Sequence, residues 1–512
     1  MRLQRFVLAL TVSGALALAT CGARPAAADA DPGEAAANRA NDLVNALEYD
    51  RARADLAKAD PGSPAVALAK ARLALYEEDC DLATALTVGG AARDDEARIL
   101  ADVARGCARV TAATAMDRDE GQGVWVRWQD EDDRALLPLI VDTVVKARTS
   151  ISRDLGVEWK RPTRITVVRD LLSLSAMTGL PYKSAQTTGT VAVAKWGRVT
   201  ILSPRASKHG YPWRDTLTHE LTHLAISMQT RERAPLWLHE GVARRQEVRW
   251  REPGPFDDRP SIESIVQRGM ELKLDLQLDK LGPSIAMLPS ADAAMVAFAE
   301  VTSFVRFYVE SQGDGALAKL LVALRTAKTA DEALAQSSGE TLAQWDVKWR
   351  ANLAKHRAEP LSPLYGLGGG APPPGMGDAH ERARLSELLF GRGHAAEAAL
   401  EIEKVPESLF SDPTLRNLKG RILEAKGDSA GATALVDDPR AWLATYGPCW
   451  GLRARLAFAR GDGATGNASQ NEALAHDPFD IPSACLPGSG VPTAPPLCEA
   501  ARKRGEPDLG SD

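Results

Sequence analysis

The segment from Thr218 to Leu224, which reads THELTHL, restricts the local fold more than any other part of this sequence. Residues four positions apart lie on one face of an α-helix, so a helix here brings His219 and His223 side by side. Their imidazoles can then bind one metal ion, and Glu220 lies beside them, where a carboxylate can act as a general base. The opposite face is apolar and can be buried; it carries Leu217, Leu221, Leu224 and Met228. The segment predicts an amphipathic helix that presents metal ligands to a cleft.

An HExxH pattern can also arise by chance on an amphipathic helix. With eight histidines in 512 residues, chance gives this pattern on the order of 1% of the time. The segment PLWLHEG at 235–241 favours a metal site, because it places Glu240 seventeen residues after His223. A catalytic zinc needs a third protein ligand. A loop that ends at Pro235 and a helix that starts near Trp237 would return Glu240 to the metal.

Together these two segments resemble the gluzincin zinc peptidases of the peptidase MA-like superfamily, especially bacterial envelope members that carry HELTH followed by P-x-W-L-x-E-G. The resemblance spans about residues 122–356 and continues through Ser303–Tyr308 and the segments that close at Arg350. It implies a thermolysin-like α+β domain with a small mixed sheet, an active-site helix and a helical lower half. It also implies hydrolysis of peptide bonds with one Zn²⁺ per chain, where Glu220 is the general base and the ligands are His219, His223 and Glu240.

The chain departs from this family at two positions. Thermolysin-like gluzincins carry an Asp four residues after the ligand Glu, which orients a ligand His, but this chain has Arg244 there. Asp215, one turn before His219, is a candidate for that orienting role. The Tyr that the family often carries is replaced by Phe298.

Four further residues near these segments have a structural and a functional interpretation. His239 is next to Glu240, and adjacent helical residues point about 100° apart. We therefore expect His239 not to bind the same metal. Tyr211 and Tyr308 are candidate donors to a transition state, but packing is the expected role of both. Trp237 is expected to anchor the core rather than to contact a substrate.

The first thirty residues are typical of a signal peptide. Arg2 and Arg5 precede an apolar run at 6–19, and Ala28-Asp29-Ala30 provides small residues for cleavage. We expect export to the periplasm or cell envelope, or secretion. The alternatives are an uncleaved N-terminal anchor and lipidation at Cys21, which would attach the protein to a membrane. The net charge of −6 and the lack of a long basic block argue against nucleic acid as a partner.

The rest of the sequence suggests several regions. Residues 31–118 read as helical, either as helical-hairpin repeats or as a generic bundle. The peptidase-like region at 122–356 contains strand patterns at 124–128, 164–168, 190–194 and 198–202, the last two forming a hairpin around Trp196-Gly197. A Gly/Pro-rich linker at 357–378 then predicts a domain boundary, because no packed element tolerates such a run.

An internal repeat follows the linker. Gly393, Gly427 and Gly461 are spaced 34 residues apart, with small residues at matching positions around them. This is the period of the tetratricopeptide repeat, so residues 379–480 are predicted to form repeats that can bind a protein partner. The tail at 481–512 is rich in Pro and Gly and is expected to be irregular.

Five cysteines remain after cleavage at Ala30, in a compartment where disulfides persist. Cys80 and Cys107 lie in one helical region and can pair, and one of the three C-terminal cysteines must be left over. None lies in a CxxC motif or a Cys/His cluster, so zinc ligation by cysteine is not expected.

These observations predict an exported zinc metallopeptidase with an α+β domain flanked by α-helical repeat regions. The strand pair around 190–202 can supply an edge that binds an extended peptide substrate by strand addition. The alternative is a non-catalytic envelope scaffold that binds a protein partner through its repeats.

Overall fold

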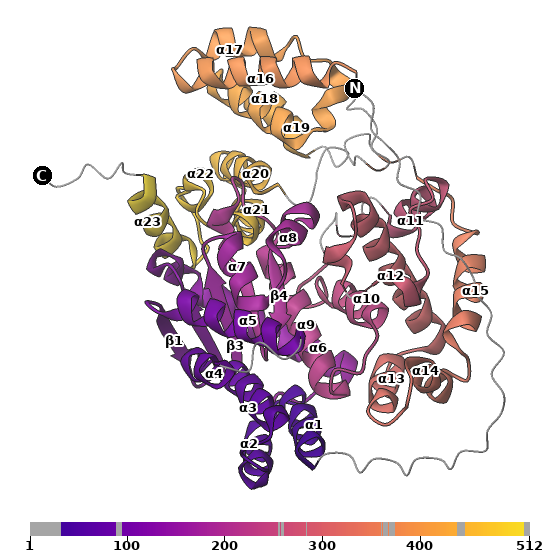
Figure 1. The fold of residues 1–512 in the computed structure, drawn as a ribbon. Coiled ribbons are helices and arrows are strands. Elements are labelled where there is room, and N and C mark those ends of the chain that lie inside the picture. Colours follow the sequence, from indigo (N-terminus) through magenta and orange to yellow (C-terminus); the bar gives the residue numbers. More distant parts are fainter. Residues whose placement is uncertain are drawn as a thin grey trace, which may run out of the picture.

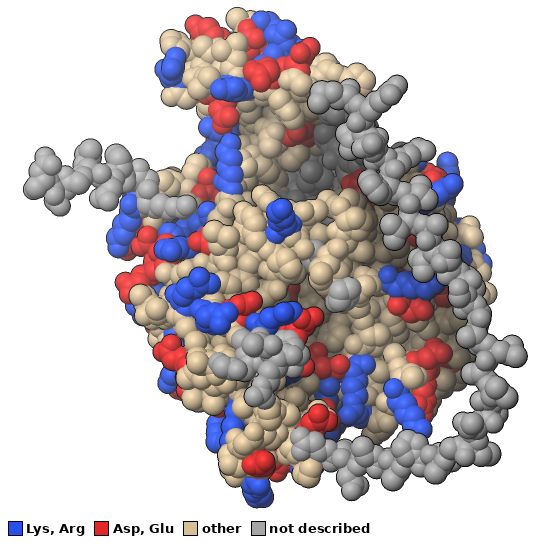
Figure 2. Space-filling view, in the orientation of Figure 1, with Lys and Arg blue, Asp and Glu red and all other residues tan. Residues whose placement is uncertain are grey.

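The computed structural model describes residues 32–88, 95–253, 257, 261–282, 284–359, 361, 367, 374–437 and 446–505 (Figure 1). The expected signal peptide, Cys21 and most of the expected linker lie outside these residues. Among the described residues, no helix is both long enough and apolar enough to cross a membrane. On the face drawn in Figure 2, basic and acidic side chains are interspersed and form no extended surface of one sign.

A five-stranded mixed sheet forms the centre of the body, in the order β1-β2-β3-β5-β4. The two edge pairs are antiparallel and the inner pairs are parallel. The strands are β1 (Ala115–Asp119), β2 (Val124–Trp128), β3 (Thr163–Val168), β4 (Ala192–Lys195) and β5 (Arg198–Leu202). Four of them confirm the predicted strands, and Trp196 and Gly197, with φ of 56° and 68°, form the turn of the predicted hairpin.

The first strand was not predicted, because residues 31–118 read as helical throughout. Its sequence, AMDRD, lacks the alternation of apolar and polar residues that marks a half-buried strand. It is held by tertiary contacts instead. Besides pairing with β2, Asp117 accepts a hydrogen bond from Trp128 Nε1 at 2.7 Å and forms an ion pair with Arg134.

Helices cover both faces of the sheet. The helix α9 (Trp213–Thr230), which carries the HELTH residues, and α6 (Leu137–Leu155) share a core with the apolar side chains of one face. The other face is covered by α7 (Leu171–Thr178), on which α8 (Tyr182–Thr188) packs, and by the N-terminal helices. These are α1 (Pro32–Asn45), α2 (Tyr49–Lys58), α3 (Pro64–Glu77), α4 (Cys80–Thr87) and α5 (Asp95–Thr111). The predicted pairing of Cys80 with Cys107 is confirmed and links α4 to α5.

A second layer of helices follows α9 along the chain. Trp237 is buried there and packs edge-on against Phe304, which in turn packs against Trp349, so its predicted role as a core anchor is confirmed. The layer comprises α10 (Leu236–Gln246), α11 (Ile262–Glu271), α12 (Ala291–Gln312), α13 (Ala316–Leu324), α14 (Ala330–Ser338) and α15 (Leu342–Leu353), with short 3-10 turns at 278–280 and 285–287.

Three helix pairs occupy the predicted repeat region. Gly393, Gly427 and Gly461 each follow the first helix of a pair and have φ of 87°, 86° and 81°, a conformation that favours glycine. The pairs are α16 (Met376–Gly391) with α17 (Ala395–Ile402), α18 (Pro413–Ala425) with α19 (Ser429–Asp437), and α20 (Gly447–Ala459) with α21 (Gly463–His476). Figure 1 shows α16–α19 projecting from the body, and the surface is hollowed beneath them in Figure 2. Their assignment as tetratricopeptide repeats stays a prediction.

The C-terminal residues differ from the expected irregular tail. They form α22 (Ile481–Ala484) and α23 (Ala494–Gly505), and a disulfide joins Cys485 to Cys498, which leaves Cys449 free and buried. Leu474 of α21 and Leu497 of α23 belong to the same apolar core as α9. The last helices therefore complete the body that contains α9, because their apolar side chains are buried against it.

Candidate metal centre

The helix α9 carries the HELTH residues as predicted. Its apolar face is buried: Leu217 and Leu221 are fully covered, Leu224 is nearly so, and Met228 packs against the same core. The helix ends at Thr230, and the next residue, Arg231, adopts a left-handed conformation with φ of 56°. Because the apolar face fixes the rotation of α9, the opposite face presents His219 and His223 to α10.

The following helix returns Glu240 to these histidines. Pro235 precedes its first turn, which agrees with the predicted start near Trp237. Gly241 lets α10 lie unusually close to α12, because a Cβ at this position would meet the Val301 carbonyl oxygen at 2.5 Å. Close packing on α12 therefore sets the distance at which Glu240 faces α9.

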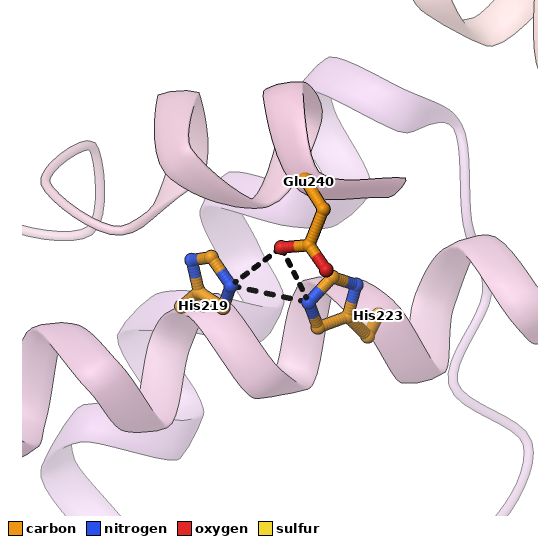
Figure 3. A group of neighbouring side chains, drawn as sticks. All are labelled: His219, His223 and Glu240. Carbon is orange, nitrogen blue, oxygen red and sulfur yellow. Dashed lines mark hydrogen bonds and ion pairs between the residues drawn. The ribbon is translucent and has the colours of Figure 1, made fainter. Parts of the chain in front are cut away.

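The three predicted ligands lie together (Figure 3). The Nε2 atoms of His219 and His223 are 3.1 Å apart, and Glu240 Oε2 is 3.5 and 3.6 Å from them. Among the described residues, these are the only three metal-ligating side chains whose donor atoms converge within 4.8 Å. Figure 3 shows both imidazoles rising from α9 toward the carboxylate of α10.

This donor set fits a zinc ion. Ligand atoms placed tetrahedrally about 2.0–2.2 Å from zinc lie roughly 3.3–3.6 Å from one another. The three observed separations are close to this range. Two imidazoles and one carboxylate leave a fourth position free, which is the arrangement of catalytic rather than structural zinc sites.

Glu220 lies beside the three ligands but bonds elsewhere. Its Oε2 accepts a hydrogen bond from the backbone N–H of Ala194 in β4 at 2.5 Å, and its side chain is buried. Burial raises the pKa of Glu220 to about 7, and the Glu240 carboxylate adds to the effect, while His219 and the Ala194 N–H oppose it. A carboxylate with a pKa near neutrality can both accept and release a proton at physiological pH.

The ligands themselves have shifted pKa values. Burial lowers the pKa of His219, but hydrogen bonds to Glu240 and Glu247 outweigh this and raise it to about 10. Burial and the neighbouring histidines lower the pKa of His223 to about 3. Burial would raise the pKa of Glu240, but His223 and His219 lower it to about 2. A metal ion that binds here displaces the proton from His219, so its uptake is coupled to pH.

Two residues support the ligands in ways that the sequence did not indicate. Glu247 Oε2 lies 3.2 Å from Nδ1 of His219, and Arg244 holds this carboxylate. His239 Nδ1 lies 3.4 Å from Nδ1 of His223, away from the Nε2 atoms that converge. His239 is therefore not placed as a fourth ligand, as expected, but it contacts one.

Asp215 does not contact the ligand histidines, so its proposed orienting role is wrong. Its carboxylate accepts hydrogen bonds from Trp250 Nε1 at 2.8 Å and from Arg251. Asp215 lies one helical turn before His219 on α9. Its side chain nevertheless bonds to Trp250 and Arg251, in the segment after α10. The carboxylate that contacts His219 lies seven residues after Glu240, whereas the family pattern places its orienting Asp four residues after the ligand Glu. The family spacing therefore could not identify Glu247.

The candidate transition-state donors lie elsewhere. Tyr211 donates its hydroxyl to the Leu202 carbonyl oxygen, and Tyr308 is buried beside Trp345, so both pack as expected. The ring of Phe298 lies 6.5 Å from that of His219, and the Arg244 guanidinium lies 5.6 Å from the centre of the Phe298 ring. The position where the family often has Tyr therefore reaches the site, but it offers no hydroxyl.

Residues 143–355 match the model of the Peptidase MA superfamily. The match covers somewhat less than half of the chain and includes α9, α10 and all four residues of the site. No curated protein and no solved structure matches the chain. The match supports a domain of the gluzincin-like peptidase superfamily, and the mixed α+β architecture is consistent with it, although β1 and β2 precede the matched residues.

Proposed function

We propose that this protein is a zinc-dependent metallopeptidase in which His219, His223 and Glu240 hold the metal and Glu220 is the general base. The observation that carries the proposal is the convergence of the three donor atoms at 3.1–3.6 Å, with Glu220 next to them. His219, His223 and Glu240 would hold a zinc ion here, which would polarise the scissile carbonyl and lower the pKa of bound water. Glu220 then accepts a proton from the attacking water and passes it to the leaving amine.

The edge strand β4 provides a place for the peptide. Leu202 donates its N–H to the Val191 carbonyl, so the backbone groups of Val193 point toward β5 and those of Ala192 and Ala194 point to the free edge. The Ala194 N–H on this edge already bonds to Glu220. An extended peptide that pairs with the edge would therefore pass beside the general base.

Export is part of the proposal. The signal-peptide pattern of residues 1–30 supports it, and the two disulfides of the described residues are typical of an oxidising compartment. The alternative scaffold function draws on α16–α19, which project from the body and could receive a protein partner (Figure 1).

Two substitutions separate the enzyme from the scaffold. Glu220→Gln removes the base but no ligand, so the protein should keep one zinc per chain and lose roughly 10²–10⁴-fold of its peptide hydrolysis. Glu240→Gln replaces a charged ligand, so it should lower zinc retention as well. Zinc content is measured by elemental analysis after dialysis, and hydrolysis with a library of quenched fluorescent peptides. A wild-type protein that binds zinc and a partner but cleaves no peptide would establish the scaffold instead.

A further inference from the structure

The free edge of β4 is short and ends close to Glu220. Beyond Lys195 the chain turns back through Trp196 and Gly197, and Trp196 is buried against the N-terminal helices. A peptide on this edge therefore has few side chains beside it. Ala194 faces the core shared with α9, whereas Lys195 follows it on the opposite face of the sheet.

Lys195 is exposed and has no carboxylate within 4.0 Å among the described residues. Its ammonium group lies 5.0 Å from the centre of the Trp196 ring, which restrains it at the end of the strand. Partial burial and the charge of Arg72 on α3 lower the pKa of Lys195, while Glu232, which follows α9, opposes them. Arg72 donates a hydrogen bond to Asn45 at 3.0 Å, and its nearest carboxylate among the described residues is that of Glu96 at 4.0 Å. The charge of Lys195 is therefore available to a ligand on the edge.

We infer that Lys195 makes the peptidase prefer substrates with an acidic side chain within two residues of the scissile bond. The inference rests on the proposed function, since it assumes that a peptide pairs with β4 beside Glu220. Side chains that face each other across paired strands lie on the same face, with Cβ atoms about 4.5–5.5 Å apart. A carboxylate on the peptide residue opposite Lys195 lies within reach of its ammonium group.

A lysine on an edge strand has a second ordinary role, which is to prevent sheets of different copies from pairing. That role requires only a charge and makes no distinction between acidic and neutral peptides. The position of Lys195, one residue after the donor to Glu220, is what favours a contact with substrate. Peptide selectivity therefore separates the two roles.

The test uses pairs of peptides that differ only in Asp versus Asn, or Glu versus Gln, at one position near the cleaved bond. The wild-type protein should cleave the acidic member roughly two- to five-fold faster in kcat/KM, as expected for one cross-strand charge pair. Lys195→Glu should reverse the preference, and Glu232→Gln should increase it by removing the nearby carboxylate. Lys319→Glu on α13, an exposed site on another helix, is the matched control and should leave it unchanged.

A binding measurement accompanies the kinetics. Zinc-loaded Glu220→Gln protein should bind the acidic peptide more tightly than its neutral twin by fluorescence anisotropy. The difference should shrink in high salt, because exposed charges are screened, and it should disappear with Lys195→Gln added. Equal cleavage and equal binding of the twin peptides by the wild type would overturn the preference while leaving the peptidase function intact. A protein that cleaves no peptide would overturn the proposed function and this inference with it.

Discussion

Glu247 Oε2 lies 3.2 Å from Nδ1 of His219, and the same carboxylate receives Arg244 at 2.7 and 2.9 Å. The other nitrogen of His219 faces Glu240. Glu247 therefore keeps a proton on Nδ1, which donates to Glu247, so that the proton a metal ion would displace is the one on Nε2. It also holds the ring in place, since Arg244 restrains the carboxylate.

Glu247→Ala should weaken zinc binding about 10–100-fold, the usual cost of losing a carboxylate behind a ligand histidine. The measurement is competition with a chelator at fixed pH, combined with thermal unfolding of the metal-free protein to show that the fold is kept. Glu271→Ala, at the exposed end of α11, is the control and should bind zinc as the wild type does. If Asp215→Asn lost as much zinc affinity as Glu247→Ala, Asp215 would orient a ligand histidine after all, and this interpretation of the site would be wrong.

The backbone N–H of Ala194 offers a second test of the site. Because this group points to the free edge, Ala194→Pro removes the hydrogen bond to Glu220 without removing one between β4 and β5. The variant should fold but lose most peptide hydrolysis, since the donor to Glu220 is gone and the proline ring projects from the edge where the peptide would pair. Circular dichroism and the peptide assay measure the two effects.

Val193→Pro is the matched comparison for this edge. The Val193 N–H points toward β5, so proline there breaks a ladder bond and should lower the midpoint of thermal unfolding. If Ala194→Pro hydrolyses peptides like the wild type, the peptide does not use this edge. That result would count against the acidic preference assigned to Lys195 as well.

Strands whose own residues favour the extended conformation could be predicted from the sequence, whereas a strand held only by its neighbours could not. The strands β2, β3 and β5 could be predicted because each is rich in β-branched or aromatic residues. The edge strand β1 could not, because its polar sequence carries no strand period and its conformation depends on pairing with β2. Likewise, the Gly/Pro run predicts a linker between packed elements, but it does not predict against which part of the protein the following helices pack.

The residues of the site also divide into those that local sequence spacing predicts and those that depend on tertiary packing. His219, Glu220 and His223 follow from spacing on one helix, which is a local property. Glu240 required the resemblance to a family, because its return depends on the loop before α10 and on the contact of Gly241 with α12. The supporting role of Glu247 depends on side-chain directions at the end of α10, which no spacing rule in the sequence specified.

Glu300 provides a test of stability against pH. It is fully buried on α12, its Oε2 accepts the Leu276 N–H at 3.1 Å, and its Oε1 has no hydrogen-bond partner. Burial raises its pKa to about 8. When folding raises the pKa of a carboxyl group, the folded state has its greatest relative stability at pH values below the group's ordinary pKa, where the group is protonated in both the folded and the unfolded state. That stability declines as the pH rises and is lost once the folded-state pKa is passed.

Glu300→Gln should therefore be more stable than the wild type at pH 9, by on the order of 5 kcal/mol, and similar to it at pH 4.5. The amide stays neutral at every pH and can still accept the Leu276 N–H. Chemical unfolding at the two pH values measures the difference. Glu310→Gln, on an exposed turn of the same helix, should show no such dependence. A wild-type protein whose stability relative to Glu300→Gln is the same at both pH values would mean that Glu300 is not protonated when buried.

The last helices make a final prediction about the linker. A Gly/Pro run such as 366–375 is expected to be sensitive to protease, and a separate C-terminal domain would then be released. The structure predicts a different result, because α21–α23 share the core of α9. The Trp213 indole donates to the Leu474 carbonyl, and Tyr211 donates its N–H to the His476 carbonyl at 3.0 Å.

After cleavage in the linker, the two pieces should therefore separate on a denaturing gel but elute together from a size-exclusion column. Removing residues 446–512 should destabilise the peptidase body, because apolar side chains such as Trp213 lose part of their cover. Leu497→Ala, at a fully buried position of α23, should lower the stability of the intact protein by about 2–5 kcal/mol. Leu400→Ala, at an exposed position of α17, should have little effect. Elution of a free, folded C-terminal piece after cleavage would show instead that the helices after the linker are a separate domain.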